Sequence, residues 1–170
     1  MATDYEQFYR DNPNGLGEPT RVFVDFFETY DRSKAKVLDV GCGQGRDALF
    51  IARMGHSVHG VDISPTGIAD LLAIARSEQL SITADVADVR DYPWRGTFDV
   101  ILIDRTLHML QADHRNAVLK SILATATGGT YVLIADERSN ISEFQEILIA
   151  DALSWTVTMR DRGYLFAKAS

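Results

Sequence analysis

Cysteine and long apolar runs are both scarce in this sequence, and each shortage excludes something. Cys42 is the single cysteine among 170 residues, so the chain cannot form an internal disulfide. No apolar run reaches the roughly 18 residues that span a membrane. The first six residues lack the basic and then apolar pattern of a signal peptide. We therefore expect a cytoplasmic protein that does not bind a membrane.

Positive charge is also in short supply, because 24 acidic and 17 basic side chains give a formal net charge of −7. The nearest approach to a cationic cluster is Arg160 with Arg162, and these two residues flank Asp161. An acidic protein repels a phosphate backbone, so we do not expect a nucleic-acid partner. The four histidines and the one cysteine lack the spacing of metal ligands, so we expect no metal.

The length suits one domain. We expect a single domain over residues 1–170, in which residues 1–33 form a helical lid or cap and residues 34–170 form the core. Within the first part, the amphipathic pattern from Pro19 to Tyr30 predicts a helix. No repeat or linker interrupts the chain.

Apolar runs alternate with helical patterns along the core, which predicts an α/β fold with a parallel sheet covered on both faces. Ser64-Pro65 is typical of a helix start, and Asp113 and Ser142 are expected to cap two later helices. Gly128-Gly129 is expected to end the helix that begins near Asp113. The predicted strands are 36–40, 57–61, 80–84, 98–103 and 130–135, followed by an antiparallel hairpin of 153–159 and 164–167. The turn of this hairpin contains Gly163, where a positive φ is expected.

The sharpest motif is Asp39-Val40-Gly41-Cys42-Gly43-Gln44-Gly45, between a predicted strand and a predicted helix. Three glycines let the backbone approach a ligand closely. Dinucleotide sites usually have G-x-G-x-x-G, whereas the spacing here is G-x-G-x-G. The Asp39 carboxylate would repel a pyrophosphate, but it suits the ammonium group of an amino acid.

Two further acids follow predicted strands. Asp62 stands at the end of the second strand, where a carboxylate can accept hydrogen bonds from both hydroxyls of a ribose. Asp85 follows the third strand and competes with Asp88 for contact with an adenine amino group.

These motifs resemble those of the class I methyltransferases that depend on S-adenosylmethionine (SAM). Residues 37–45 resemble the first motif of that family, residues 59–64 its second-strand acid, and residues 98–101 its fourth strand. The resemblance implies a Rossmann-like, doubly wound, mostly parallel seven-stranded sheet with an antiparallel C-terminal hairpin. It implies SAM as cofactor and S-adenosylhomocysteine (SAH) as product. The implied cofactor-binding residues are Asp39, Gly41, Cys42, Gly43, Gly45, Arg46, Asp62, Ile63, Asp85, Val86 and Asp104.

A narrower resemblance points to the tellurite-resistance and thiopurine-type methyltransferases. It is carried by Gly45-Arg46-Asp47-Ala48-Leu49, by Gly55-His56-Ser57-Val58 and, more loosely, by the closing segment of residues 163–168. It implies a small, soft nucleophile as methyl acceptor.

Several of the named residues have a second interpretation. Arg46 and Asp47 either serve the cofactor or hold the first turn of a helix. Asp104 and Arg105 lie beside the methionine part of the cofactor, or they form a surface ion pair. His108 is either a general base or a histidine satisfied by packing. Cys42 is interpreted as a small filler of the loop beside the cofactor, not as a nucleophile.

The sequence thus predicts a SAM-dependent methyltransferase that acts on a small molecule, with His108 and Arg105 as the catalytic candidates. A non-catalytic SAM-binding protein and an NAD-dependent oxidoreductase remain as alternatives. Glu137, Arg138 and the first 30 residues are expected to read the acceptor. Neither the acceptor nor the oligomeric state follows from the sequence.

Overall fold

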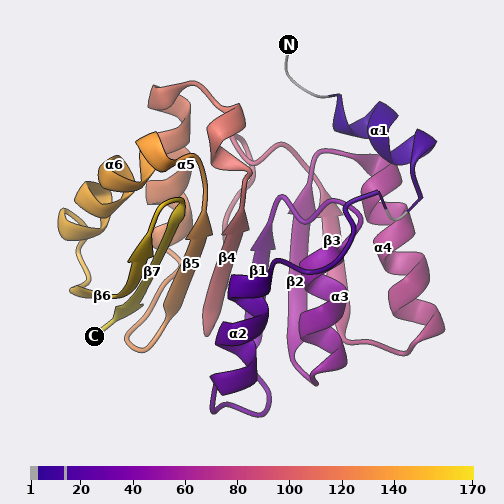
Figure 1. Cartoon of the computed structure of the whole chain (residues 1–170), viewed down its shortest axis with the longest axis horizontal. Coiled ribbons are helices and arrows are strands. Elements are labelled where there is room, and N and C mark those ends of the chain that lie inside the picture. The colour runs from indigo at the N-terminus through magenta and orange to yellow at the C-terminus, as the bar shows by residue number, and fades with distance from the viewer. Residues whose placement is uncertain (1–3, 14) are drawn as a thin grey trace. The chain divides into compact units, whose positions relative to one another are not determined.

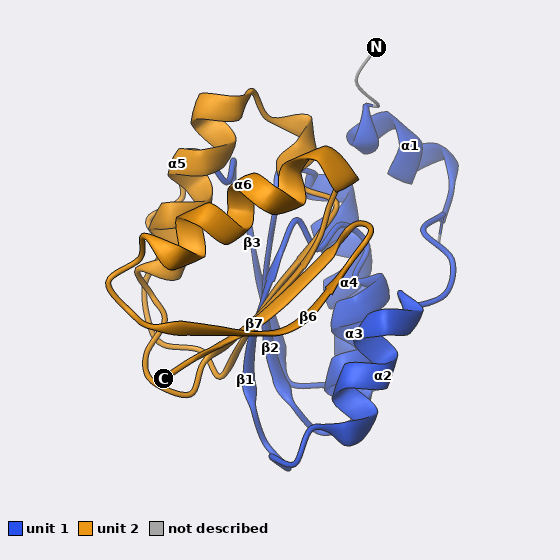
Figure 2. Cartoon of the chain, turned by 60° about the vertical axis from the view of Figure 1, so that its left-hand side comes forward, with its two compact units in different colours: residues 1–89 blue, residues 90–170 orange. Residues whose placement is uncertain are grey.

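The computed structural model describes residues 4–13 and 15–170. The chain forms two compact units, Met1–Val89 and Arg90–Ser170 (Figure 2). The elements of the first unit are α1 (Tyr5–Asp11), α2 (Arg21–Thr29), β1 (Lys36–Val40), α3 (Arg46–Arg53), β2 (Ser57–Asp62), α4 (Pro65–Ser77) and β3 (Ile82–Val86) (Figure 1). Those of the second are β4 (Val100–Asp104), the short 3-10 helix η1 (Leu107–Met109), α5 (Ala112–Leu123), β5 (Tyr131–Ala135), α6 (Arg138–Ile149), β6 (Trp155–Asp161) and β7 (Tyr164–Ala169).

The seven strands have the order β3-β2-β1-β4-β5-β7-β6. Strand pairs β1–β2, β2–β3 and β4–β5 are parallel, whereas β7 runs antiparallel to both β5 and β6. The predicted Rossmann-like sheet with an antiparallel C-terminal hairpin is therefore confirmed.

In the first unit, the carboxyl ends of the three strands are aligned by their register. Val40 pairs with Val61, and Asp62 pairs with Val86. Four of the five residues of β1 are buried, as expected for a strand covered on both faces. This register brings the chain that follows β1, β2 and β3 to one edge of the unit.

The helices that follow β1 and β2 begin in different ways. The cap of α3 is Gly45, with a φ of +84°, so a glycine forms the sharp strand-to-helix turn. The cap of α4 is Ser64, whose Oγ accepts a hydrogen bond from the amide of Gly67 at 3.0 Å, and Pro65 occupies the first helical position. The predicted start of α4 is confirmed.

The first 30 residues form two short helices. In α2, Phe23 and Phe27 are buried and carry the apolar face that the sequence pattern predicts. In α1, Asp4 caps the helix through the amide of Gln7, and Tyr9 is the buried residue. The chain between α1 and α2 runs past the carboxyl ends of the first unit's strands (Figure 1).

Three helix boundaries in the second unit differ from the predicted ones. α5 begins at Ala112, so Asp113 lies in its first turn, where its charge still suits the helix dipole. α6 begins at Arg138 and not after Ser142. α5 ends at Leu123, five residues before Gly128, so the glycine pair does not end that helix.

The start of α6 is displaced because a carboxylate replaces the expected serine. Asp136 Oδ1 accepts hydrogen bonds from the Glu137 amide at 2.8 Å and from Asn140 Nδ2 at 2.7 Å. These contacts hold the first turn directly after β5. The connection is therefore shorter than the sequence pattern indicates.

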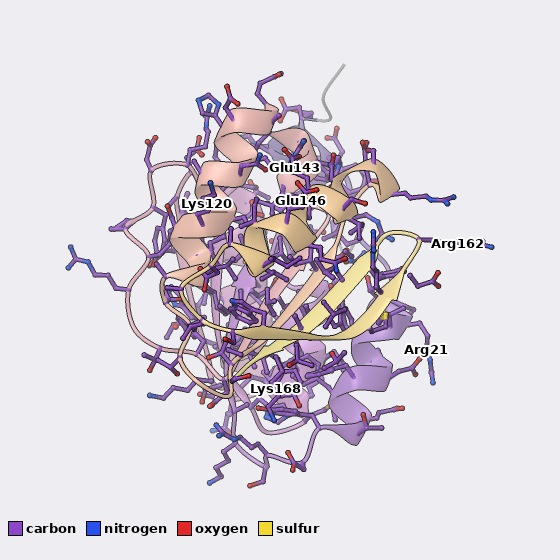
Figure 3. The ribbon with its side chains drawn as sticks, turned by 90° about the vertical axis from the view of Figure 1, so that its left-hand side faces the viewer. Arg21, Lys120, Glu143, Glu146, Arg162 and Lys168 are labelled. Atoms are coloured by element: carbon purple, nitrogen blue, oxygen red, sulfur yellow. The ribbon has the colours of Figure 1, made fainter. Side chains whose placement is uncertain are left out.

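The hairpin β6–β7 turns at residues 162–163, and Gly163 is needed there for space. Its φ is not in the left-handed region, so the expected positive φ is wrong. A Cβ on Gly163 would lie 2.8 Å from the carbonyl oxygen of Asp136. The Gly163 carbonyl accepts a hydrogen bond from the Asp136 amide at 2.9 Å. Beyond this close contact, the side chain of Arg162 projects outward from the turn (Figure 3).

Helix length bears on the membrane question. In the part of the chain that the structure describes, no helix is long and apolar enough to cross a bilayer.

Candidate cofactor and acceptor site

The glycine loop between β1 and α3 holds its shape through left-handed backbone. Gly41, Gly43 and Gly45 have φ values of +75°, +51° and +84°. The amides of Gly41 and Cys42 both donate to the carbonyl of Val61, at 2.7 and 3.2 Å. Residues with a Cβ rarely adopt such φ values, so the glycines are needed where they stand.

Asp62, at the end of β2, binds the glycine loop and the next loop together. Its Oδ2 accepts from the Gly43 amide at 2.9 Å, and its Oδ1 accepts from the Ser64 amide at 2.8 Å. Burial raises the pKa of this carboxyl, and the two amide hydrogen bonds oppose that rise. Each oxygen keeps further acceptor capacity, since an ionised carboxylate offers about four lone-pair sites.

Two apolar side chains stand exposed beside Asp62. Ile63 is 63 % exposed and Val86 is 51 % exposed, although most large apolar residues of the described chain are buried. Val86 pairs in register with Asp62 across β2 and β3. Exposed apolar groups next to a carboxylate provide flat contact area for a planar ring.

The third acid, Asp85, is the penultimate residue of β3 and not its last. Its Oδ2 lies 3.6 Å from Nε2 of His59, an ion pair when that imidazole is protonated. Asp88, the competing adenine contact, is half-buried just after β3. The choice between Asp85 and Asp88 stays a prediction.

Asp39 and Cys42 lie buried at the base of the loop. Burial raises the pKa of the Cys42 thiol, and the charge of Asp39 adds to this. A thiol kept protonated is a poor nucleophile, which agrees with the interpretation of Cys42 as a filler. The sulfur packs where a Cβ on Gly60 would stand, 2.6 Å away, so Gly60 makes room for it.

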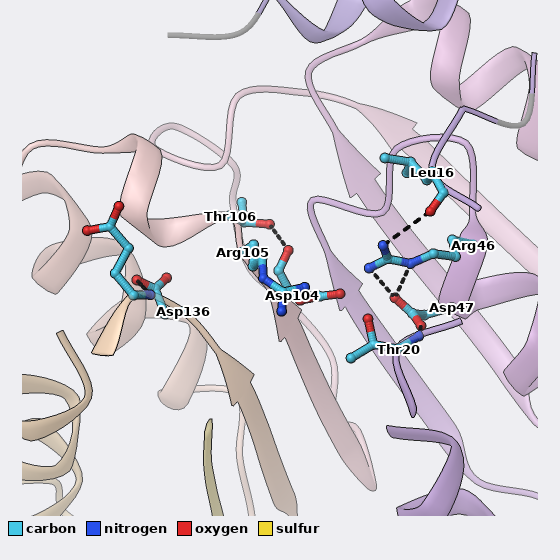
Figure 4. A network of polar contacts seen from close by, with 9 residues as sticks. Leu16, Thr20, Arg46, Asp47, Asp104, Arg105, Thr106 and Asp136 are labelled. Carbon is cyan, nitrogen blue, oxygen red and sulfur yellow. Dashed lines mark hydrogen bonds and ion pairs between the residues drawn. The ribbon is translucent and has the colours of Figure 1, made fainter. Parts of the chain in front are cut away.

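Arg46 and Asp47 hold the N-terminal chain (Figure 4). Arg46 donates to Asp47 Oδ2 from Nε at 3.3 Å and from a terminal nitrogen at 3.1 Å, and to the Leu16 carbonyl at 3.5 Å. Asp47 Oδ1 accepts from the Thr20 amide at 2.9 Å. These contacts favour the second interpretation of the pair, that it is structural.

In the second unit, Asp104 and Arg105 end β4 as an ion pair. A guanidinium nitrogen of Arg105 lies 3.3 Å from Asp104 Oδ1, with side chains 53 % and 6 % exposed respectively. Arg105 has a φ of +50°, an uncommon conformation for a residue with a side chain. Its amide donates to the Ala135 carbonyl at 2.8 Å, which holds this conformation. Local strain of this kind is common at functional sites.

His108 lies in η1, shortly after β4. Its amide donates to Asp136 Oδ2 at 3.0 Å. The side chain is half-buried, and its buried Nδ1 has no hydrogen-bond partner among the described residues. The structure therefore does not bear out a histidine fully satisfied by packing.

Sequence reasoning missed three residues of this region. Asp136 directly follows a buried strand, the same signal that identified Asp62. Glu6 and Tyr9 gave no such signal, because their partners lie about 60 and 34 residues away in the chain. Among the described residues, no group of three or more His, Cys, Asp and Glu side chains is arranged to hold a metal ion.

A family model described as "Methyltransferase domain" matches residues 37–129, more than half of the chain. The chain belongs to this methyltransferase family. By family and fold it is a class I SAM-dependent methyltransferase, as the motifs predicted. The alternative of an NAD-dependent oxidoreductase is thereby set aside.

Among its relatives is the 2-heptyl-1-hydroxyquinolin-4(1H)-one methyltransferase of Mycobacteroides abscessus, 29 % identical over 137 residues, which are 79 % of this chain and 60 % of that one. TehB of Haemophilus influenzae is 29 % identical over 102 residues, which are 60 % of this chain and 36 % of TehB. The chain thus spans only 36 to 60 % of these two relatives.

Solved structures share the fold. The crystal structure of TehB from Haemophilus influenzae matches with a TM-score of 0.78 and 19 % identity, over 98 % of this chain and 67 % of that chain. The magnesium protoporphyrin IX methyltransferase of Synechocystis, solved with bound SAM, matches with a TM-score of 0.75 and 18 % identity, over 100 % and 99 %.

Proposed function

We propose that this chain transfers the methyl group of SAM to a small-molecule nucleophile. The observation that carries the proposal is the position of Asp62, whose two oxygens are fixed by backbone amides while they keep acceptor capacity for a ribose. The left-handed glycines next to it leave backbone close to where a ligand would lie.

The described residues suit this cofactor. A Cβ on Gly43 or Gly45 would overlap the side chains of Tyr9 or Leu71, so the loop is already tightly packed and has no room for larger residues. We assign Asp62 to the ribose, Asp39 to the amino acid part, and Ile63 with Val86 to the faces of the adenine. The remaining proposed cofactor residues are Gly41, Cys42, Gly43, Gly45, Arg46, Asp85 and Asp104.

The protein's chemical task is mainly one of positioning. When bound, SAM supplies a methyl group on a sulfonium, a leaving group that needs no further activation. The chain must then hold an acceptor in line, and proximity of this kind supplies roughly 7–11 kcal/mol of the barrier. A base is needed only where the acceptor is still protonated near neutral pH.

We assign the acceptor side to residues that follow β4 and β5. His108 would take a proton from a hydroxyl acceptor, since half of its ring is accessible and its loop is fixed by Asp136. Arg105 and the exposed Arg138 would supply the positive field that an anionic nucleophile requires. For a thiolate or an oxyanion of selenium or tellurium, these charges matter more than the base.

A small acceptor is supported by three observations. The net charge of −7 disfavours polyanions. The described chain has few residues beyond the seven-stranded fold and its helices, so a large substrate would find little platform. The quinolone methyltransferase of Mycobacteroides abscessus is named for a small-molecule acceptor. Within this class, the resemblance to enzymes of soft nucleophiles favours thiols and chalcogen oxyanions.

The test is a SAH-release assay over thiols, selenite, tellurite, phenols and a tRNA pool. We expect turnover of a thiol or chalcogen acceptor first, and of hydroxylated compounds second. Replacing His108 by Gln should lower the rate with a phenol at least about tenfold and leave the rate with a thiolate within about twofold. Methylation of tRNA alone would contradict the small-molecule assignment. SAH binding without release of product from any acceptor would favour a non-catalytic SAM-binding protein.

A further inference from the structure

The first turn of α4 is bound by a carboxylate from the far end of the first unit. Glu6, in α1, accepts hydrogen bonds from the hydroxyl of Ser64, from the Thr66 amide at 3.2 Å and from Thr66 Oγ1 at 2.7 Å. A helix start attracts a negative charge, because its first amides lack partners within the helix. Pro65 has no amide hydrogen, so the Thr66 amide is the first that α4 can offer.

Ser64 links this contact to the candidate ribose carboxylate. Its hydroxyl binds Glu6, while its amide donates to Asp62 Oδ1 at 2.8 Å. The other oxygen of Asp62 binds the Gly43 amide at 2.9 Å. One continuous chain of hydrogen bonds therefore runs from α1 through the start of α4 to the glycine loop.

Tyr9, one turn after Glu6 in α1, covers the same place. Its side chain is buried, and a Cβ on Gly43 would overlap its hydroxyl group. A Cβ on Gly67 would lie 3.1 Å from Tyr9 Cδ2. Burial raises the pKa of the Tyr9 phenol, so it stays neutral under all ordinary conditions. α1 thus lies directly on the loop where the cofactor is assigned.

The chain after α1 is held by the polar residues of the glycine loop. Gln44 Nε2 donates to the Asn12 carbonyl at 3.2 Å and to Asp70 Oδ2 at 2.9 Å, and its Oε1 accepts from the Gly15 amide at 3.1 Å. Gln44 is almost fully buried, so these contacts satisfy its whole amide. Together with the Arg46 and Asp47 contacts, they leave α1 as the part of this segment that can swing.

We propose that Glu6 is a positioning residue, which latches α1 onto the first turn of α4 and so controls how fast the cofactor enters and leaves beside Asp62. α1 has only seven residues, too few for a helix to be stable by itself, so its place depends on these contacts. Hydrogen bonds from Ser64 and Thr66 lower the pKa of Glu6 to about 2, which keeps the latch ionised at every assay pH. The inference rests on the proposed SAM site.

The experiment measures association and dissociation rates of SAH by stopped-flow fluorescence. In Glu6→Gln, an amide NH₂ replaces one acceptor oxygen. We expect dissociation to be about tenfold faster, the factor that loss of one charge-assisted hydrogen bond implies. Association should also be faster, because the same lid must open for entry, so the Kd changes less than either rate. Hydrogen exchange over residues 5–11 should accelerate, while exchange over β4 and β5 should not.

Three variants make the result specific. Thr66→Val removes the hydroxyl donor at nearly constant size and should act in the same direction. The double variant should add little to Glu6→Gln, because both changes break one contact. Glu6→Asp, which retains the carboxylate, should recover part of the wild-type rate. The matched control is Glu28→Gln in α2, an exposed carboxylate 4.0 Å from Arg21, which should leave both rates unchanged.

The latch and the SAM site fail in different ways. If the wild-type chain does not bind SAH, the proposed function is wrong. If the wild type binds SAH but Glu6→Gln and Thr66→Val exchange it at wild-type rates, the latch is wrong and the site stands. A faster dissociation with unchanged association would also overturn the latch, because it would mean a lost contact and not an opened lid.

Discussion

Asp62 is the residue on which the cofactor assignment depends most. Its carboxylate is both a structural link, through Gly43 and Ser64, and the proposed partner of the ribose. Gly43 has a comparable double part, because its positive φ shapes the loop while its missing side chain leaves space for Tyr9. At this scale, function and local structure use the same atoms.

Replacing Asp62 by Ala should weaken SAH binding by about 30- to 1000-fold, because two charge-assisted hydrogen bonds are lost, for roughly 2–4 kcal/mol. Isothermal calorimetry measures the affinity, and circular dichroism checks that the variant is folded. Asp25→Ala in α2, which removes an exposed carboxylate paired with Arg21, is the control. A folded Asp62→Ala variant that binds within about threefold of the wild type would exclude Asp62 from the site.

Gly43→Val should abolish SAH binding while the chain still folds. The backbone at φ +51° resists a branched side chain, and the added atoms would meet Tyr9. The control is Gly96→Ala, where φ is +86° and a Cβ would meet nothing within 4 Å, so that backbone strain acts without loss of space. Normal binding by Gly43→Val would show that the cofactor lies elsewhere.

At the scale of elements, the second unit depends on the contact between the hairpin turn and the end of β5. Gly163 and Asp136 touch through their backbones, and the Asp136 side chain holds both the start of α6 and the amide of His108. One close approach therefore supports three elements.

Gly163→Ala should reduce the free energy of unfolding by about 1–3 kcal/mol, because its Cβ would lie 2.8 Å from the Asp136 carbonyl oxygen and must force the turn apart. Urea denaturation measures this change. Gly129→Ala serves for comparison, since a Cβ there meets nothing within 4 Å and only its φ of +89° opposes the substitution. Equal stability of Gly163→Ala and the wild type would contradict the close packing of the turn.

At the scale of the whole molecule, stability should depend on pH through His56. This buried imidazole accepts a hydrogen bond from the Ala35 amide through Nδ1 at 3.1 Å, which only the neutral ring can do. Burial lowers the pKa of His56 below its ordinary 6.5. The unfolded chain then binds the proton first, so stability decreases as the pH falls from about 6.5 through the lowered value.

We therefore expect the wild type to lose more stability between pH 7.5 and pH 5.5 than His56→Asn, whose side-chain oxygen can keep the contact with Ala35. Thermal or urea unfolding at both pH values measures the difference. His114→Gln, which removes an exposed histidine of α5, should keep the wild-type pH dependence. If His56→Asn and the wild type have the same pH dependence, His56 does not titrate differently in the folded state.

The sequence by itself determined the order of strands and helices, the glycine loop and the acid after β2. These features are local: buried strands are apolar, tight turns need glycine, and a ligand-binding acid follows a strand. It also determined the family, because residues 37–129 carry the family's motifs in one stretch.

The tertiary structure alone decided what depends on contacts between distant residues. The start of α6 moved four residues forward because Asp136, and not Ser142, satisfies its first turn. Gly163 serves a close approach that its own neighbours in sequence do not reveal. Glu6 and Tyr9 gain their meaning from Ser64, Thr66 and Gly43, which lie far along the chain, and periodicity carries no information about such pairs.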